Sequence, residues 1–194
     1  MMLIELPAIL NIPQKLLPFI ERFNDYRFFL AEGGRGSAKS QSICRWLLYI
    51  AEKKKVRIVC GRETQNTIDE SVYRVLADLI QEYNLNFKVL SNRIIHNQTG
   101  SEIQFKGFRE QGKANIKGME GVDILFIDEA EAITKQTLDV IIPTIRKPNS
   151  KIMFAMNRFV RNDPVYDFCL ARDNCLMIHI DYFENPYCPQ ELKD

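Results

Sequence analysis

The chain has 194 residues, of which 46% are hydrophobic and 26% charged, and its formal net charge is +1 at pH 7. This composition excludes disordered, collagen-like and disulfide-scaffold proteins, and the length indicates one domain with a sizeable core. The balanced charge also excludes a protein that coats nucleic acid through bulk positive charge, so any such contact must be local.

Strands and helices are expected to alternate along the chain. Buried apolar runs predict the strands, and apolar residues spaced three and four apart predict the helices. The first 25 residues contain three prolines among apolar residues, which indicates an N-terminal arm with a short helix near 16–24. After the arm, the expected elements are a strand at 26–31, a helix at 39–52, a strand at 56–60, a helix at 67–83, short strands at 87–90, 93–96 and 102–105, a strand at 122–127, a helix at 134–142, a strand at 152–156, a helix at 164–170 and a strand at 176–180. This order predicts an α/β fold with a mostly parallel central sheet flanked by helices.

Two connections in the middle of the chain stand out. Residues 97–101 read Asn-Gln-Thr-Gly-Ser between two short strands, which predicts one β-hairpin excursion from the sheet. Residues 107–121 are rich in glycine and charge, and they indicate a mobile loop.

A glycine-rich segment between the first strand and the first long helix predicts a nucleotide-binding loop. It consists of Gly33, Gly34, Arg35, Gly36, Ser37, Ala38, Lys39 and Ser40. Small residues let main-chain N–H groups surround the phosphates, and the new helix directs its positive dipole end at them. Lys39 would contribute a charge to the β- and γ-phosphates, and Ser40 a hydroxyl to Mg²⁺. The usual pattern has glycine at Ala38, so either the loop is slightly altered or Ala38 keeps a negative φ.

The apolar run 124–127 is followed directly by Asp128 and Glu129. In an open α/β sheet such acids lie at the carboxyl edge, where ligands bind. Asp128 would hold Mg²⁺, and Glu129 would polarise the attacking water. Glu131 could be a second acid at the site, although a solvated charge at a helix N-terminus is favoured.

The two motifs together predict a Mg²⁺-dependent ATPase. A GTPase would need an Asn-Lys-x-Asp string, which is absent, and a two-lobed helicase would not fit in 194 residues. Two alternatives stay open: a P-loop phosphotransferase or kinase, although no Arg-rich lid is evident, and a non-catalytic nucleotide-binding assembly module, with Ala38 as the sign of a degenerate loop.

The remaining composition indicates a reducing compartment. The five cysteines show no Cys-x-x-Cys spacing and the two histidines lack Cys or His partners, so free thiols and no zinc site are expected. The apolar runs are much shorter than a membrane span, so no membrane partner is expected.

Several segments resemble, in order, the large terminase subunit of tailed bacteriophages and prophages, the ATP-driven motor that packs DNA into procapsids. They are 33–40, 60–68, 71–72, 116–123, 128–131, 142–148 and 182–186. Arg35 within the loop and the string Ile-Pro-Thr-Ile-Arg-Lys-Pro at 142–148 are the most particular of these features. The resemblance implies an additional-strand, RecA-like ATPase domain at 26–181, preceded by the arm at 1–25. Residues 182–194 would begin a linker to a nuclease domain, so no nuclease activity is expected from this chain.

The resemblance also implies roles for individual residues. Arg35 would sense the γ-phosphate or stabilise its developing charge. Lys117 falls where some relatives carry an arginine that reaches the neighbouring subunit's ATP, with Arg109 and Lys113 as rivals in the same loop. Asn157 resembles the polar residue that couples hydrolysis to movement.

The partners implied by the resemblance are double-stranded DNA, bound transiently, a portal protein and the small terminase subunit. The active form would be a homo-oligomeric ring at the portal in the host cytoplasm, and the isolated domain a monomer. The local basic clusters are 53–55 with Arg57, and Arg158 with Arg161. A solvated helix end or loop is the favoured interpretation of each.

Overall fold

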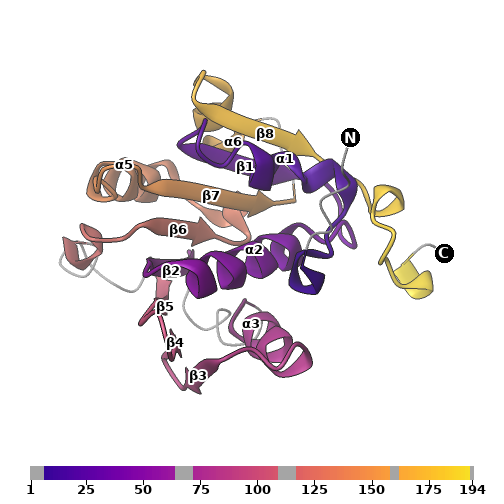
Figure 1. Cartoon of the computed structure of the whole chain (residues 1–194). Helices are drawn as coiled ribbons and strands as arrows, with labels where there is room; N and C mark the ends of the chain where they lie inside the picture. The colour runs from indigo at the N-terminus through magenta and orange to yellow at the C-terminus, as the bar shows by residue number, and fades with distance from the viewer. Residues whose placement is uncertain (1–6, 64–71, 109–116, 158–161, 193–194) are drawn as a thin grey trace.

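The computed structural model describes residues 7–63, 72–108, 117–157 and 162–192. An eight-stranded sheet in the order β3-β4-β5-β2-β6-β7-β1-β8 forms its centre (Figure 1). The strands are β1 (Phe28–Glu32), β2 (Arg57–Arg62), β3 (Phe87–Leu90), β4 (Arg93–His96), β5 (Glu102–Gly107), β6 (Ile124–Ile127), β7 (Lys151–Met156) and β8 (Cys175–His179). The strands from β8 through β5 pair in parallel, whereas β3 with β4 and β4 with β5 are antiparallel.

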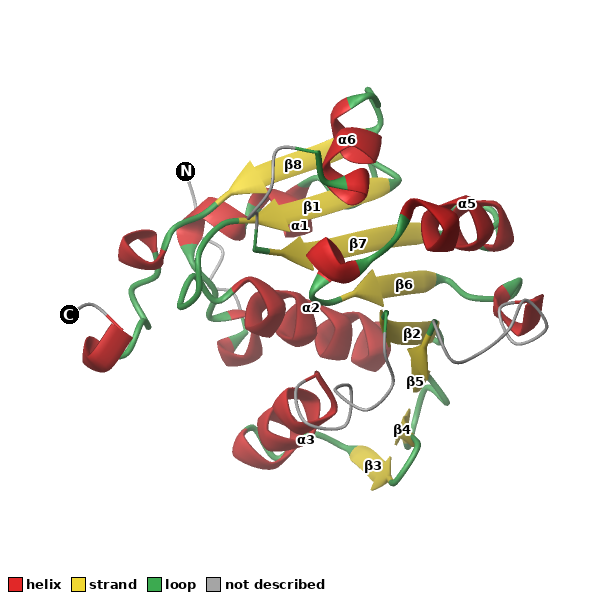
Figure 2. Ribbon diagram, turned by 180° about the vertical axis from the view of Figure 1, so that it is seen from behind, coloured by secondary structure: helices red, strands yellow, loops and turns green. Residues whose placement is uncertain are grey.

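Helices cover both faces of the sheet (Figure 2). The α-helices are α1 (Pro18–Glu21), α2 (Lys39–Lys53), α3 (Val72–Glu82), α5 (Lys135–Thr144) and α6 (Pro164–Leu170). Short 3₁₀ helices are η1 (Ala8–Leu10), η2 (Gln14–Leu16), η4 (Lys117–Met119), η5 (Ala130–Ala132), η6 (Tyr182–Glu184) and η7 (Gln190–Leu192). Because side chains alternate along a strand, Phe29 of β1 packs in the core with α2 and α3, and Phe28 packs in the core with α5 and α6.

The expected alternation of strands and helices is confirmed, with element ends shifted by a few residues. The hairpin is present as β4 and β5, in the register Ile94 opposite Ile103, and β3 extends it at the sheet edge. The helix expected at 67–83 is seen as α3, while 64–71 lie outside the described residues. The loop expected at 107–121 contains η4, and its residues 109–116 are likewise outside.

The described part of the N-terminal arm is packed against the domain. Leu10, Leu16 and Phe19 are buried in the core with α2, and the Phe19 ring lies 5.4 Å from that of Phe29. The short helix expected near 16–24 is only α1, which is four residues long. The prolines divide this segment into short turns, and the burial of its apolar side chains holds it on the sheet.

The order of the strands brings the predicted motifs together. Strand β7 lies between β1, which precedes the glycine-rich loop, and β6, which precedes the two acids. This is the additional-strand arrangement that the resemblance implies. Because the strands from β8 to β5 run in one direction, their carboxyl ends share one edge of the sheet, where open α/β folds bind ligands.

Two expectations from composition concern the cysteine thiols and membrane-spanning segments. All five cysteines are free, as expected. Burial raises the pKa of the Cys60 thiol, which makes this cysteine a packing residue. Within the described ranges, no helix is long and apolar enough to cross a membrane.

Candidate functional site

The glycine-rich loop connects β1 to α2 and turns tightly against the residue that follows β8. Gly33 has a φ of 146°, and a Cβ atom there would collide with the carbonyl oxygen of Ile180. Its N–H donates to Met156 O at the end of β7, at 3.2 Å. Helix α2 begins at Lys39, and the N–H groups of its first turn have no acceptor within the helix. The loop therefore presents main-chain donors at the positive end of a helix dipole.

Lys39 is buried and lies inside the loop. Its Nζ donates to Gly33 O at 3.0 Å, Gly34 O at 2.7 Å and Ser37 Oγ at 2.8 Å. Burial lowers the pKa of the ammonium group, and the carboxylates of Glu131 and Asp128 oppose that shift. The ammonium group is thus held by carbonyl oxygens. It lies where the sequence predicts that phosphates bind.

Ala38 adopts the left-handed conformation, with φ 60° and ψ 19°. The alternative that this position keeps a negative φ is therefore wrong. The Cβ atom makes this conformation unfavourable by about 1–2 kcal/mol relative to glycine. The loop keeps a glycine-like geometry with an alanine in it, because the packing of the surrounding strands and helix fixes the path of the chain.

The Ala38 conformation makes a testable prediction. Replacing Ala38 by glycine should leave thermal stability within about 1 kcal/mol, because relief of strain and the greater entropy of the unfolded glycine oppose each other. Replacing it by valine should weaken nucleotide binding at least about tenfold, because a β-branched residue is an outlier at this φ. Thermal unfolding and calorimetric titration with ATP measure both effects. Equal ATP affinity in the two variants would contradict the argument.

Asp128 and Glu129 follow β6 directly and reach the same edge of the sheet. Asp128 is 5% exposed, and its Oδ1 accepts a hydrogen bond from Ser40 Oγ at 2.5 Å. Arg62, at the end of β2, pairs through Nη2 with Asp128 Oδ2 at 2.5 Å and through Nη1 with Glu129 Oε2 at 3.1 Å. Glu129 has a φ of 51°, a sparsely populated conformation for a residue other than glycine.

The Ser40 hydroxyl and the Asp128 carboxylate fit Mg²⁺, because both are hard oxygen donors and they lie side by side. In the part of the chain that the structure describes, no group of three or more His, Cys, Asp or Glu residues could hold a metal. A cation here would therefore complete its shell with water and phosphate oxygens, as Mg²⁺ does at phosphate sites.

Glu131 belongs to the site, and its interpretation as a solvated helix charge is wrong. Its Oε2 accepts the Asn157 N–H at 3.1 Å, and its Oε1 accepts Asn157 Nδ2 at 3.3 Å. Burial raises the pKa of this carboxyl. Asn157, at the end of β7, accepts a bond from Lys39 Nζ at 3.2 Å on its Oδ1. The amide thus connects the lysine of the loop to an acid that follows β6.

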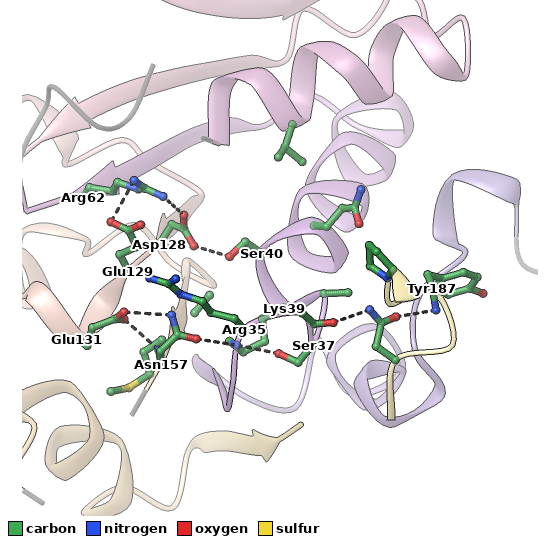
Figure 3. Close-up of a pocket in the computed structure, with 18 residues that line it drawn as sticks. Arg35, Ser37, Lys39, Ser40, Arg62, Asp128, Glu129, Glu131, Asn157 and Tyr187 are labelled. Carbon is green, nitrogen blue, oxygen red and sulfur yellow. Dashed lines mark hydrogen bonds and ion pairs between the residues drawn. The ribbon is translucent and has the colours of Figure 1, made fainter. Parts of the chain in front are cut away.

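Arg35 lies at the mouth of the site. It is exposed and lines the cavity, and Figure 3 shows its side chain directed toward the side where Glu129 and Glu131 lie. Its role stays a prediction, as do the roles of the other loop residues.

Lys117 does not lie near the nucleotide-binding loop of its own chain. It begins η4, which precedes the amino end of β6, and Arg57 Nη2 donates to Gly118 O there at 3.2 Å. Asp128 and Glu129 lie at the other end of that strand. A catalytic role for Lys117 would therefore be in a neighbouring subunit, and its side chain is outside the described part. Arg109, Lys113, Arg158 and Arg161 also fall outside the described residues.

These groups surround a cavity of about 740 Å³ (Figure 3). The sequence motifs located the loop and the two acids. They missed Arg62, although it ends a strand whose carboxyl end had to reach this edge. They also assigned no role in the site to Asn185 and Tyr187, which follow β8 and line the cavity.

His179 marks a second hollow beside the loop, of about 500 Å³. Its ring lies 3.0 Å from Glu32 Oε1 and 3.1 Å from Asp181 Oδ2. The hydrogen bond with Asp181 and the charge of Glu32 raise the pKa of the imidazole. The ring therefore connects β8 to Glu32 of β1 at the base of the loop.

Comparison with known proteins gives one consistent result. A family model described as "Phage terminase large subunit" matches residues 25–194. The large subunit of the terminase of Bacillus phage SPP1 is 25% identical over 181 residues, which cover 82% of this chain and 42% of that protein. The chain thus spans less than half the length of this curated relative.

Solved structures show the same fold. The large terminase of a thermophilic bacteriophage matches with a TM-score of 0.78 and 13% identity, over 94% of this chain and 48% of that one. The complex of that terminase with ADP matches with a TM-score of 0.75 and 15% identity. The N-terminal domain of the DNA packaging ATPase from bacteriophage phi29 matches with a TM-score of 0.65 and 16% identity, over 89% of this chain and 96% of that one.

Proposed function

The chain belongs to the phage terminase large subunit family, and we propose that it hydrolyses ATP to move double-stranded viral DNA into a procapsid. The observation that carries the proposal is the meeting of three groups at one edge of the sheet. They are the loop with Lys39, the Ser40–Asp128 oxygen pair, and Glu129 beside them. Each matches one requirement of phosphoryl transfer to water: phosphate binding, Mg²⁺ binding and orientation of the nucleophile.

In this proposal the loop binds the β- and γ-phosphates through main-chain N–H groups, and Lys39 exchanges its carbonyl partners for phosphate oxygens. Ser40 and Asp128 would hold Mg²⁺, which supplies positive charge to the phosphates. Glu129 accepts a hydrogen bond from the attacking water and orients it toward the γ-phosphorus. Arg35, at the mouth of the cavity, stabilises the negative charge that develops on the phosphoryl oxygens.

The contacts of Asn157 would change when the bound phosphates change, and this change would reach the sheet. Its Oδ1 bonds Lys39 and its amide nitrogens bond Glu131, so a movement of Lys39 toward the γ-phosphate must alter this chain of contacts. Asn157 directly follows β7, the strand between the loop strand and the acidic strand. It is therefore placed to couple hydrolysis to a shift between these elements.

The nucleotide and the motor role draw support from relatives. The large terminase of the thermophilic bacteriophage forms a complex with ADP, and the phi29 protein is named a DNA packaging ATPase. On the basis of these relatives we propose an ATPase domain at 26–181, with an arm at 1–25 and the start of a linker at 182–194. The proposed partners are a portal protein and a small terminase subunit, with a ring of copies acting in the host cytoplasm. No finding favours the phosphotransferase or the non-catalytic module.

Removing the lysine charge tests the proposal. We expect Lys39→Met to weaken ATP binding at least about tenfold, because a charge-assisted bond to phosphate contributes about 1.5–3 kcal/mol. The unmodified protein should release inorganic phosphate from ATP only when Mg²⁺ is present. The Lys39→Met variant should release none. Calorimetric titration and a phosphate-release assay measure the two effects.

Lys151→Met is the matched control for the lysine substitution. Lys151 is also buried, and it bonds Tyr26 O at 2.6 Å at the amino end of β7, opposite the loop. This variant should bind and hydrolyse ATP like the unmodified chain. Normal turnover in Lys39→Met, or transfer of the phosphate to an acceptor other than water, would refute the proposed hydrolysis.

A further inference from the structure

The cavity at the loop has two chemically different ends. Arg62, Asp128 and Glu129 form a charged end. The uncharged aromatic side chain of Tyr187 lies at the opposite end (Figure 3), and Gln41 and Pro189, which carry an amide and an apolar ring but no charge, also line the cavity. A cavity charged at one end and uncharged at the other matches a ligand with the same asymmetry, and a nucleoside triphosphate is such a ligand.

The loop fixes the direction in which this ligand lies. The γ-phosphate must face Asp128 and Glu129, because the oxygen donors for Mg²⁺ and the residue that orients water are there. The β-phosphate would then lie over Lys39 and the start of α2. The α-phosphate, ribose and base would continue away from the acids, toward the end of the cavity where Tyr187 lies (Figure 3).

The segment after β8 is tied to the loop by Asn185. This side chain is buried, and its Nδ2 donates to Gly36 O at 2.7 Å. Its Oδ1 accepts the main-chain N–H of Tyr187 at 3.0 Å. One side chain thus joins the phosphate-binding loop to the residue that carries the aromatic ring.

The ring of Tyr187 is held from its other side as well. Its hydroxyl forms a hydrogen bond with Asn11 Oδ1 of the N-terminal arm. Glu184, three residues earlier in the chain, pairs with Lys15 of the same arm at 2.6 Å. Although it is fixed at both ends, Tyr187 is 47% exposed. An ordered aromatic ring with free surface loses little entropy when it binds a ligand.

We propose that Tyr187 is the nucleoside-binding residue of this site, with its ring stacked on the purine base of the bound nucleotide and its position set by Asn185. The inference deepens the proposed ATPase function and rests on it. Stacking does not discriminate between bases that have similar π-faces. Tyr187 therefore contributes affinity for ATP and GTP alike, and other groups select between them.

Comparing ATP with inorganic triphosphate isolates the contact with the nucleoside. Calorimetric titration of the full chain with each ligand in Mg²⁺ gives two affinities on the same folded population. In Tyr187→Ala the affinity for ATP and for GTP should fall at least about fivefold, because stacking on a base contributes about 1 kcal/mol or more. The affinity for triphosphate should not change. Tyr187→Phe keeps the ring and should retain most of the affinity for ATP.

Two further variants make the outcome decisive. Tyr182→Ala removes an exposed tyrosine of the same segment that does not line the cavity, and it should bind both ligands normally. Lys39→Met should lose ATP and triphosphate together, which tests the proposed function separately. Unchanged ATP affinity in Tyr187→Ala, or an equal loss for ATP and triphosphate, would overturn the inference while Lys39→Met still reported on the ATPase site.

Discussion

Replacing Glu129 by glutamine is expected to lower the rate of ATP hydrolysis by about 10²–10⁴-fold, the usual contribution of a positioned general base. The amide has the same shape but cannot accept the proton of the attacking water. Nucleotide binding should be retained, because the carboxylate of Glu129 pairs with Arg62 and not with the loop or the Ser40–Asp128 pair in the described part of the site. Single-turnover phosphate release and ATP titration, measured on the same preparation, separate the two effects.

A matched control exists on the surface. Glu120 pairs with Arg146 at 2.8 Å, and its side chain is 53% exposed, against 51% for Glu129. Glu120→Gln therefore removes a carboxylate of similar exposure, paired with an exposed arginine outside the cavity, and it should leave turnover unchanged. Normal turnover in Glu129→Gln would exclude this residue as the group that orients water. A parallel loss in Glu120→Gln would point to a general loss of charge instead.

The parts of the site that lie close together in sequence could be predicted from it. The loop needs small residues, a lysine and a hydroxyl in consecutive positions, so residues 33–40 carry the whole pattern. Asp128 and Glu129 follow an apolar run that a buried parallel strand requires. The strand and helix alternation was predictable for the same reason, because periodicity is a local property.

Groups that depend on strand order could not be found this way. Arg62 enters the site because β2 lies next to β6, and Asn185 enters it because β8 lies next to β1. Neither neighbour relation is encoded by local spacing. Ala38 shows the reverse case, in which the local preference for a negative φ was clear but the tertiary structure overrides it.

The position of Glu131 could not be predicted for a related reason. Glu131 follows Asp128 and Glu129 closely and precedes a helix. A glutamate in such a position usually lies in solvent, near the positive end of the helix dipole. Here the end of β7 meets it, and Asn157 bonds it through both main-chain and side-chain nitrogens. The partner lies 26 residues away in sequence, so only the packing of β7 against β6 reveals it.

Replacing Arg62 by alanine is expected to destabilise the protein without nucleotide by about 3–5 kcal/mol, the range for breaking a buried ion pair. The reason is the environment of Asp128, which is buried and would lose its nearest positive charge. Glu129 adds little to this effect, because its exposed carboxylate is solvated. Urea unfolding followed by circular dichroism measures the change in the free energy of unfolding.

The surface pair of Arg93 with Glu102, at 3.2 Å, is the control, and Arg93→Ala should cost less than about 1 kcal/mol. A second substitution tests the physical cause. If the cost in Arg62→Ala comes from an uncompensated carboxylate, then Asp128→Asn in the same chain removes that charge, and the double variant must be more stable than the sum of the single effects predicts. Additive effects would mean that Arg62 stabilises the fold by packing alone.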